Sequence, residues 1–108
     1  MTYSSVYITA PTETEASTIA RALISERLAA CANVFDGVRS FYRWEGEVQD
    51  DTETVLILKT RTDLLDALIK RVVELHSYDV PCVVAWPIQG GHEDYLDWLQ
   101  AETMAVSS

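Results

Sequence analysis

Two cysteines and two histidines are the side chains of this chain best suited to metal chemistry. Besides two methionines they are its only soft or borderline ligands: Cys31, His76, Cys82 and His92. Thiolate and imidazole together suit Cu(I), Cu(II) or zinc. Cys31, His76 and Cys82 are therefore predicted as metal ligands, with copper or another divalent cation as the cofactor. Their spacing matches no preformed ligand motif.

Each of these residues also has a structural interpretation. Cys31 follows a predicted helix between two alanines, where a cysteine often serves as a small buried filler. His76 falls in the last turn of a predicted helix, where the helix dipole alone favours a histidine. His92 follows a Gly-Gly pair and is expected to be exposed.

A second set of polar and aromatic residues could line a pocket for a small ligand. Glu45 and Lys59 are its charged members, with a structural ion pair as the alternative role. The tryptophans could equally anchor a core or an interface. The predicted ligand-binding residues are Tyr42, Trp44, Glu45, Lys59, Thr60, Tyr78, Tyr95 and Trp98.

Catalysis has little support in the sequence. A lone cysteine could act as a nucleophile, but no spacing pairs it with a histidine, and there is no Gly-rich phosphate loop or zinc-hydrolase helix. The chain is therefore not expected to be an enzyme.

Length and charge narrow the class of protein further. The 108 residues, 48% hydrophobic and without a Pro/Gly/Ser-rich linker, predict one domain over 1–108. A formal net charge of -9 disfavours nucleic acid and anionic membranes as partners. No run could span a bilayer and the first residues lack a secretion signal, so a cytoplasmic location with reduced cysteines is expected.

The stretch from Val38 to Thr60 predicts one long β-hairpin, with a turn centred on Gln49-Asp50-Asp51. Its first arm alternates with the period of a strand, whereas Val55–Leu58 is apolar without alternation and should be buried on both faces. Something must cover the second face of the sheet, and a homo-oligomer is the predicted cover.

The remaining elements complete a βαββαβ order with a short C-terminal helix, a pattern typical of a ferredoxin-like α+β sandwich. Capping residues, apolar periodicity and prolines set the expected bounds. These are a strand over 6–8, a helix over 13–30, an extended segment over 31–35, a bend or bulge at 36–37, a helix from 62 to 76, a strand over 82–86, a helix over 93–102 and a fraying tail over 105–108.

Distances in this fold separate the candidate residues. The strands beginning near Cys31 and Cys82 lie at opposite edges, roughly 14 Å apart at about 4.8 Å per strand, so one chain should not bridge them. Contact across a subunit boundary stays open. The predicted turn places Glu45 and Lys59 roughly 20 Å apart at about 3.3 Å per residue, so a pocket using both must lie between subunits.

Five ordered blocks resemble the CutA divalent-cation tolerance proteins. They are Arg27–Asn33, Tyr42–Gly46, Leu58–Arg61, His76–Pro81 and Asp94–Leu99. The resemblance implies a ferredoxin-like subunit, a tight homotrimer related in architecture to P-II signalling proteins, and tolerance to copper and other divalent cations.

Four positions depart from the family's usual pattern. His76-Ser77-Tyr78-Asp79 stands where His-Pro-Tyr-Glu is common, Cys82 replaces a usual glutamate, and Arg43 replaces a frequent aromatic residue. The exchange of a carboxylate for a thiol changes the donor chemistry at position 82.

The sequence thus predicts a cytosolic homotrimer that binds a divalent metal, with copper favoured, in a tolerance role. The alternative is a P-II-like regulatory or scaffolding trimer. Its intersubunit clefts would bind a small anionic or neutral ligand near Lys59 and Tyr95, or its surface would dock a protein partner.

Overall fold

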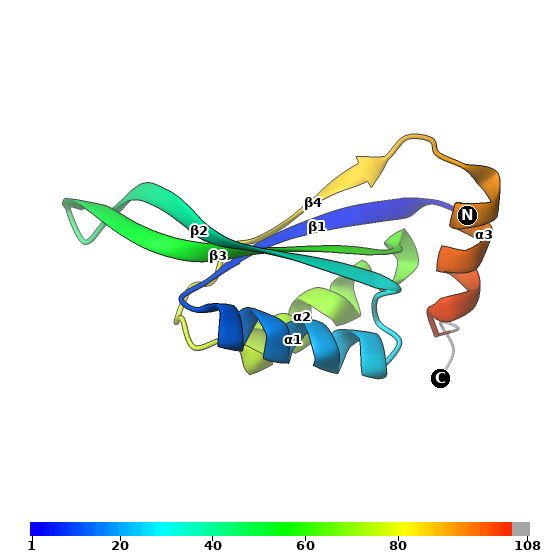
Figure 1. Ribbon diagram of the computed structural model, residues 1–108, viewed down its shortest axis with the longest axis horizontal. Coiled ribbons are helices and arrows are strands. Elements are labelled where there is room, and N and C mark those ends of the chain that lie inside the picture. Colours follow the sequence, from blue (N-terminus) through cyan, green and yellow to red (C-terminus); the bar gives the residue numbers. More distant parts are fainter. Residues whose placement is uncertain (105–108) are drawn as a thin grey trace.

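The computed structural model describes residues 1–104 and has the predicted α+β character and element order (Figure 1). Its elements are β1 (Tyr3–Ala10), α1 (Glu13–Ser25), β2 (Cys31–Trp44), β3 (Glu47–Arg61), a 3-10 turn η1 (Thr62–Leu64), α2 (Leu65–Leu75), β4 (Val83–Ile88) and α3 (Glu93–Glu102). The expected fraying over 105–108 lies outside the described residues.

The four strands form one antiparallel sheet in the order β2-β3-β1-β4. Helices α1 and α2 lie side by side beneath one face of this sheet, and α3 lies at the end where β1 begins (Figure 1). β2 and β3 extend well beyond the helices as a hairpin. Among the described residues, no helix covers the other face of the sheet over most of its length (Figure 1).

The core forms between the sheet and the two main helices because alternate strand residues point the same way. Val6 and Ile8 of β1 pair in register with Leu58 and Leu56 of β3, and all four are fully buried. They pack against apolar residues of both helices, namely Ile19, Leu23, Leu68 and Val72. This layer fixes the positions of β1 and β3, and through them of both edge strands.

Helix α1 begins as predicted but ends earlier. The Thr12 hydroxyl accepts a hydrogen bond from the Glu15 backbone N–H at 3.1 Å, which caps the first turn. The helix stops at Ser25 instead of continuing to residue 30, because Arg27 adopts a left-handed conformation with φ +62°. The N–H of Leu28 then bonds back to the carbonyl of Leu23 at 2.9 Å.

The hairpin turn lies at Glu45-Gly46, so its prediction at Gln49-Asp50-Asp51 was wrong. Trp44 pairs with Glu47 across a two-residue loop in which Glu45 has φ +51° and Gly46 φ +82°. Two positive φ angles match the right-handed twist of the flanking strands. The polar run Gln49–Asp51 belongs to β3 instead.

The predicted bulge is confirmed. The register of β2 against β3 shifts between Phe35 and Val38, and Gly37 has φ +75°. Gly37 tolerates this backbone because it has no side chain. The bulge divides β2 into a segment above the helices and a segment in the projecting hairpin.

The face opposite the helices is apolar and open in one chain. Phe35, Val84 and Trp86 are each about half exposed, at 51%, 50% and 52%, and Tyr7 packs edge-on against Trp86 with ring centroids 5.7 Å apart. Strand β4 is apolar along its whole length, yet most of it is exposed in the single chain. The apolar pattern of β4 therefore has no cover within residues 1–104.

Candidate functional site

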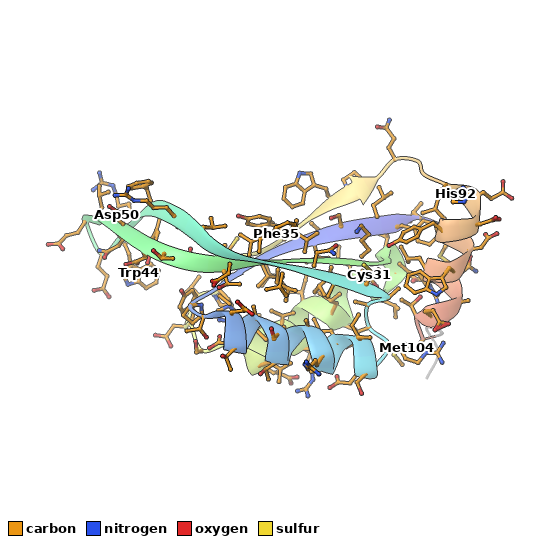
Figure 2. All side chains as sticks on the ribbon, in the orientation of Figure 1. Cys31, Phe35, Trp44, Asp50, His92 and Met104 are labelled. Atoms are coloured by element: carbon orange, nitrogen blue, oxygen red, sulfur yellow. The ribbon has the colours of Figure 1, made fainter. Side chains whose placement is uncertain are left out.

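The residues predicted to carry function separate into two groups at opposite ends of the sheet. Cys31 lies near α3, whereas Trp44 lies in the projecting hairpin at the other end (Figure 2). No site within one chain can include both groups.

The first group, here called the Lys59 corner, comprises Cys31, Asn33, Lys59 and Tyr95. Cys31 and Lys59 are register partners on β2 and β3. The Lys59 Nζ donates to Asn33 Oδ1 at 3.4 Å, and the Cys31 Sγ lies 3.9 Å from the same oxygen. Within residues 1–104, Lys59 forms no ion pair with a carboxylate. This end of the face thus presents a cation beside polar, uncharged groups.

Tyr95 of α3 completes the Lys59 corner. Burial raises the pKa of its hydroxyl, and the neighbouring Cys31 thiol raises it further. Tyr95 therefore keeps its proton at neutral pH and can donate a hydrogen bond to a ligand. Trp98 packs on Tyr95 with ring centroids 5.5 Å apart and stays about half exposed.

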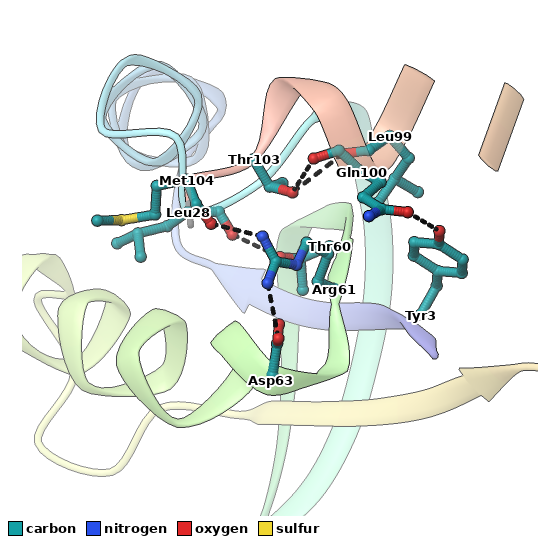
Figure 3. A network of polar contacts seen from close by, with 9 residues as sticks. All are labelled: Tyr3, Leu28, Thr60, Arg61, Asp63, Leu99, Gln100, Thr103 and Met104. Atoms are coloured by element: carbon teal, nitrogen blue, oxygen red, sulfur yellow. Dashed lines mark hydrogen bonds and ion pairs between the residues drawn. The ribbon is translucent and has the colours of Figure 1, made fainter. Parts of the chain in front are cut away.

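Thr60 has a structural position rather than a place at the Lys59 corner. It is fully buried, and its hydroxyl donates to the Leu28 carbonyl at 2.7 Å. The adjacent Arg61 donates to the Met104 carbonyl at 2.8 Å and to Asp63 Oδ2 at 2.7 Å (Figure 3). The bond to Met104 joins the segment after α3 to the end of β3, and the bond from Thr60 joins β3 to the segment between α1 and β2.

His76 is buried, and both of its ring nitrogens have partners. Nε2 lies 2.7 Å from the carbonyl oxygen of Thr9, so Nε2 carries the hydrogen. Nδ1 then accepts the backbone N–H of Tyr78 at 3.1 Å. Neither nitrogen is free to bind a metal ion in this conformation. His76 instead joins the end of α2 to the end of β1.

The second group lines a groove of about 620 Å³ between the base of the hairpin and the loop that joins α2 to β4. The sequence analysis named four of its residues: Tyr42, Trp44, Tyr78 and Cys82. It missed the others, which are Thr9, Ser40, Phe41, Glu53, Ser77, Asp79 and Val80. The signal available in the sequence was a glutamate only two residues before a buried apolar run, as Glu53 is before Val55.

Glu53 is a buried carboxylate that interacts with two other residues of the groove, Tyr78 and Cys82. Only 6% of its surface is exposed, and its Oε2 accepts a hydrogen bond from the Tyr78 hydroxyl at 2.8 Å. Burial raises the pKa of Tyr78, and the Glu53 carboxylate raises it further. Burial also raises the pKa of the Cys82 thiol, with Glu53 adding to the effect. Both Tyr78 and Cys82 are therefore protonated at neutral pH.

Tyr42 lies nearer the hairpin turn than Glu53 does, and it binds a second carboxylate, that of Asp51. Its hydroxyl donates to Asp51 Oδ2 at 2.5 Å, and this bond is the main cause of the raised pKa of Tyr42. Both tyrosines of the groove therefore act as hydrogen-bond donors to acidic residues.

The two cysteines lie at diagonally opposite corners of the sheet. Cys31 pairs with Lys59 and is level with Ser5, whereas Cys82 precedes Val83, the partner of Ile8. Three strand spacings and about four residues along the strands separate them by roughly 20 Å. Within residues 1–104, no three His, Cys, Asp or Glu side chains are grouped so as to hold a metal ion.

Glu45 and Lys59 are farther apart than the sequence analysis expected. The turn at Glu45-Gly46 leaves twelve residues of β3 between Glu47 and Lys59, which is roughly 40 Å at about 3.3 Å per residue. The expected value of about 20 Å followed from the misplaced turn.

Together, these observations define an α+β protein with helices on one sheet face and polar candidate sites at both ends of the other. The CutA1 divalent ion tolerance protein family matches residues 4–102. The chain therefore belongs to the CutA1 family.

Individual relatives agree with this assignment. The divalent-cation tolerance protein CutA of Thermus thermophilus is 52% identical over 98 residues, which are 91% of this chain and 95% of that protein. Its solved structure has a TM-score of 0.92, 50% identity, and coverage of 94% of this chain and 99% of that chain. The crystal structure of CutA1 from Oryza sativa has a TM-score of 0.94 and 48% identity, with coverage of 96% of this chain and 95% of that chain.

Length and location vary among the relatives. The chain spans 55% of the Oryza sativa protein called CutA 1, chloroplastic, to which it is 51% identical over 91% of its own length. A solved relative from Archaeoglobus fulgidus is titled a periplasmic divalent cation tolerance protein, with a TM-score of 0.90, 40% identity, and coverage of 93% of this chain and 97% of that chain. Within residues 1–104, no helix is long and apolar enough to cross a membrane.

Proposed function

We propose that this chain forms a cytoplasmic homotrimer of ferredoxin-like subunits that binds copper or another divalent cation and contributes to cation tolerance. The role is one of binding, not catalysis. Membership of a divalent ion tolerance family supports the cation. The observation that supports a specific metal site is that the two thiols, Cys31 and Cys82, lie at the two free edges of one sheet.

Assembly is the first step of this proposal. The open face carries Phe35, Val84 and Trp86, and a monomer rarely exposes so continuous an apolar surface. A head-to-tail ring brings one edge of a subunit toward the opposite edge of its neighbour. In such a ring, β2 of one subunit faces β4 of the next, so Cys31 and Cys82 can approach only across the boundary.

The metal ligands follow from this arrangement. We assign the site to Cys31 and Cys82 of neighbouring subunits, because thiolates favour copper and zinc. His76, predicted with them from the sequence, has a structural role here because both of its nitrogens are engaged. A metal must displace the proton of the Cys82 thiol, whose pKa is raised. Binding should therefore strengthen as pH rises through neutrality, by about tenfold per unit for each proton released.

Native mass spectrometry of the reduced protein tests both steps in one experiment. Titration with zinc, and with copper under anaerobic conditions, should give a trimer that retains a whole-number ratio of metal. Combined Cys31→Ala and Cys82→Ala should weaken retention about tenfold or more without dissolving the trimer. His92→Ala, which removes an exposed imidazole, is the matched control. A trimer with only non-stoichiometric uptake would contradict the metal site, and a monomer would contradict the assembly.

The Lys59 corner supports a second candidate function. Lys59 has no carboxylate partner within residues 1–104, and it is the register partner of Cys31, the residue that also interacts with the Tyr95 hydroxyl. This arrangement suits a small anionic or neutral ligand in a cleft between subunits, as in a P-II-like regulatory trimer.

Thermal shift measurements distinguish this alternative from metal binding. Citrate and inorganic phosphate, used as anionic probes, should raise the melting temperature of the wild type. Lys59→Ala should abolish that rise and leave metal binding unchanged, whereas Lys70→Ala on the exposed surface of α2 should preserve it. Failure of any anion to shift the wild type would count against a regulatory ligand at Lys59.

A further inference from the structure

The groove at the base of the hairpin differs in composition from the Lys59 corner. Its lining includes two carboxylates, Glu53 and Asp79, and no lysine, arginine or histidine. Four of the other lining residues are aromatic, namely Phe41, Tyr42, Trp44 and Tyr78. An acidic, aromatic cavity disfavours anions and selects for positive charge.

Glu53 supplies a buried acceptor that the protein itself only half satisfies. Its Oε2 accepts the Tyr78 hydroxyl, and within residues 1–104 its Oε1 has no hydrogen-bond partner and its carboxylate no cationic partner. The side chain as a whole is buried, yet Oε1 is not one of the fully buried unpartnered atoms, so a charged donor entering from outside can reach it. The free oxygen of Glu53 is therefore a built acceptor for a charged donor.

The walls of the groove decide which kind of cation fits. Hard metal ions prefer shells of oxygen ligands and water, whereas aromatic faces stabilise organic cations that also carry carbon. A cavity of about 620 Å³ lies within the range of small-molecule sites, roughly 300 to 1,000 Å³. The combination suits an organic molecule with a charged nitrogen.

We propose that this groove binds the primary ammonium or guanidinium group of a small organic molecule. Glu53 is its principal anchor, because the free Oε1 can accept an N–H from the ligand. Asp79 adds a second negative charge, and the rings of Trp44 and Tyr42 cover the carbon skeleton. This site is separate from the Lys59 corner and shares only Cys82 with the proposed metal site, and it needs neither of them.

Benzylamine and benzyl alcohol provide a matched pair of probes, equal in shape and different in charge at neutral pH. Calorimetric titration of the native protein should show that the amine binds at least about tenfold more tightly than the alcohol. Glu53→Gln should remove most of this preference, since it keeps the shape and removes the charge. Glu47→Gln, an exposed carboxylate on β3 outside the groove, is the control.

Several results would overturn the proposal. Equal binding of amine and alcohol, or no binding of either to the wild type, would do so without any variant. Unchanged amine affinity in a folded Glu53→Gln protein would remove the anchor. Dissociation of the oligomer by Glu53→Gln, with no amine binding to the wild type, would assign the cation to a lysine or arginine of a neighbouring copy instead.

Discussion

The part of the sheet above the helices and the projecting hairpin are stabilised in different ways, although they share two strands. We call the first part the body and residues 38–52 the arm. In the body, Leu56 and Leu58 are fully buried against α1 and α2. In the arm, Phe41 and Val48 are 63% and 66% exposed, and the hairpin to which they belong projects beyond α1 and α2 (Figure 1).

Polar pairs take the place of a core in the arm. Arg39 donates two hydrogen bonds to Asp50, at 2.9 and 2.7 Å, and Tyr42 donates one to Asp51. Arg43 donates to the Gly46 carbonyl at 3.1 Å and so supports the turn. The body can fold around its own apolar layer, whereas the exposed rings of the arm are suited to contacts that lie outside one chain.

The largest expected difference between body and arm comes from truncating one large apolar residue in each. Leu58→Ala should lower the free energy of unfolding by about 2 to 5 kcal/mol, because it leaves a cavity in the core. Phe41→Ala in the arm should change it by less than about 0.5 kcal/mol. Urea denaturation measures both. An equal loss in the two variants would show that the arm is packed in the assembled protein.

A smaller effect is expected at the turn. Gly46→Ala forces a side chain onto φ +82° and should cost about 1 to 2 kcal/mol. Gly90→Ala is the matched control, because no atom lies within 4 Å of its added carbon and its φ is not left-handed. Thermal unfolding of the two variants compares them directly. Equal melting temperatures would mean that the turn of the arm does not contribute to the stability measured in the cooperative thermal unfolding of the protein.

The smallest effect is expected for Arg39→Gln, and it should depend on pH. The hydrogen bonds from Arg39 lower the pKa of Asp50 below its ordinary value of 3.8. A carboxyl with a lowered pKa stabilises the folded state above that ordinary value and loses this contribution as pH falls through its folded pKa. The difference in melting temperature between wild type and variant should therefore be small at pH 7 and vanish in acid. A difference that persists in acid would point to packing instead of charge.

The sequence predicted the body better than the arm, for a physical reason. Apolar periodicity reports burial, and Val6, Ile8 and the helices are held by burial, so their order and type were predicted correctly. The turn was not, because left-handed residues such as Glu45 carry no apolar signal and the run Gln49–Asp51 resembled a turn more closely.

The groove was missed for a related reason. Glu53 contacts Tyr78 across 25 positions of the chain, and no local pattern records such a meeting. His76 shows the converse: its residue type suggested a ligand, while its hydrogen bond to Thr9, 67 positions away in the chain, arises only once α2 and β1 are packed.

The bulge at Gly37 also bears on polymerisation. A sheet with two unpaired edges, β2 and β4, can in principle add strands without limit and grow into a fibre. The register shift between Phe35 and Val38 interrupts one of these edges, and Pro87, which has no N–H, lies in the other. Neither edge therefore offers an unbroken row of donors and acceptors, so strand-by-strand aggregation is discouraged at both sides of the molecule.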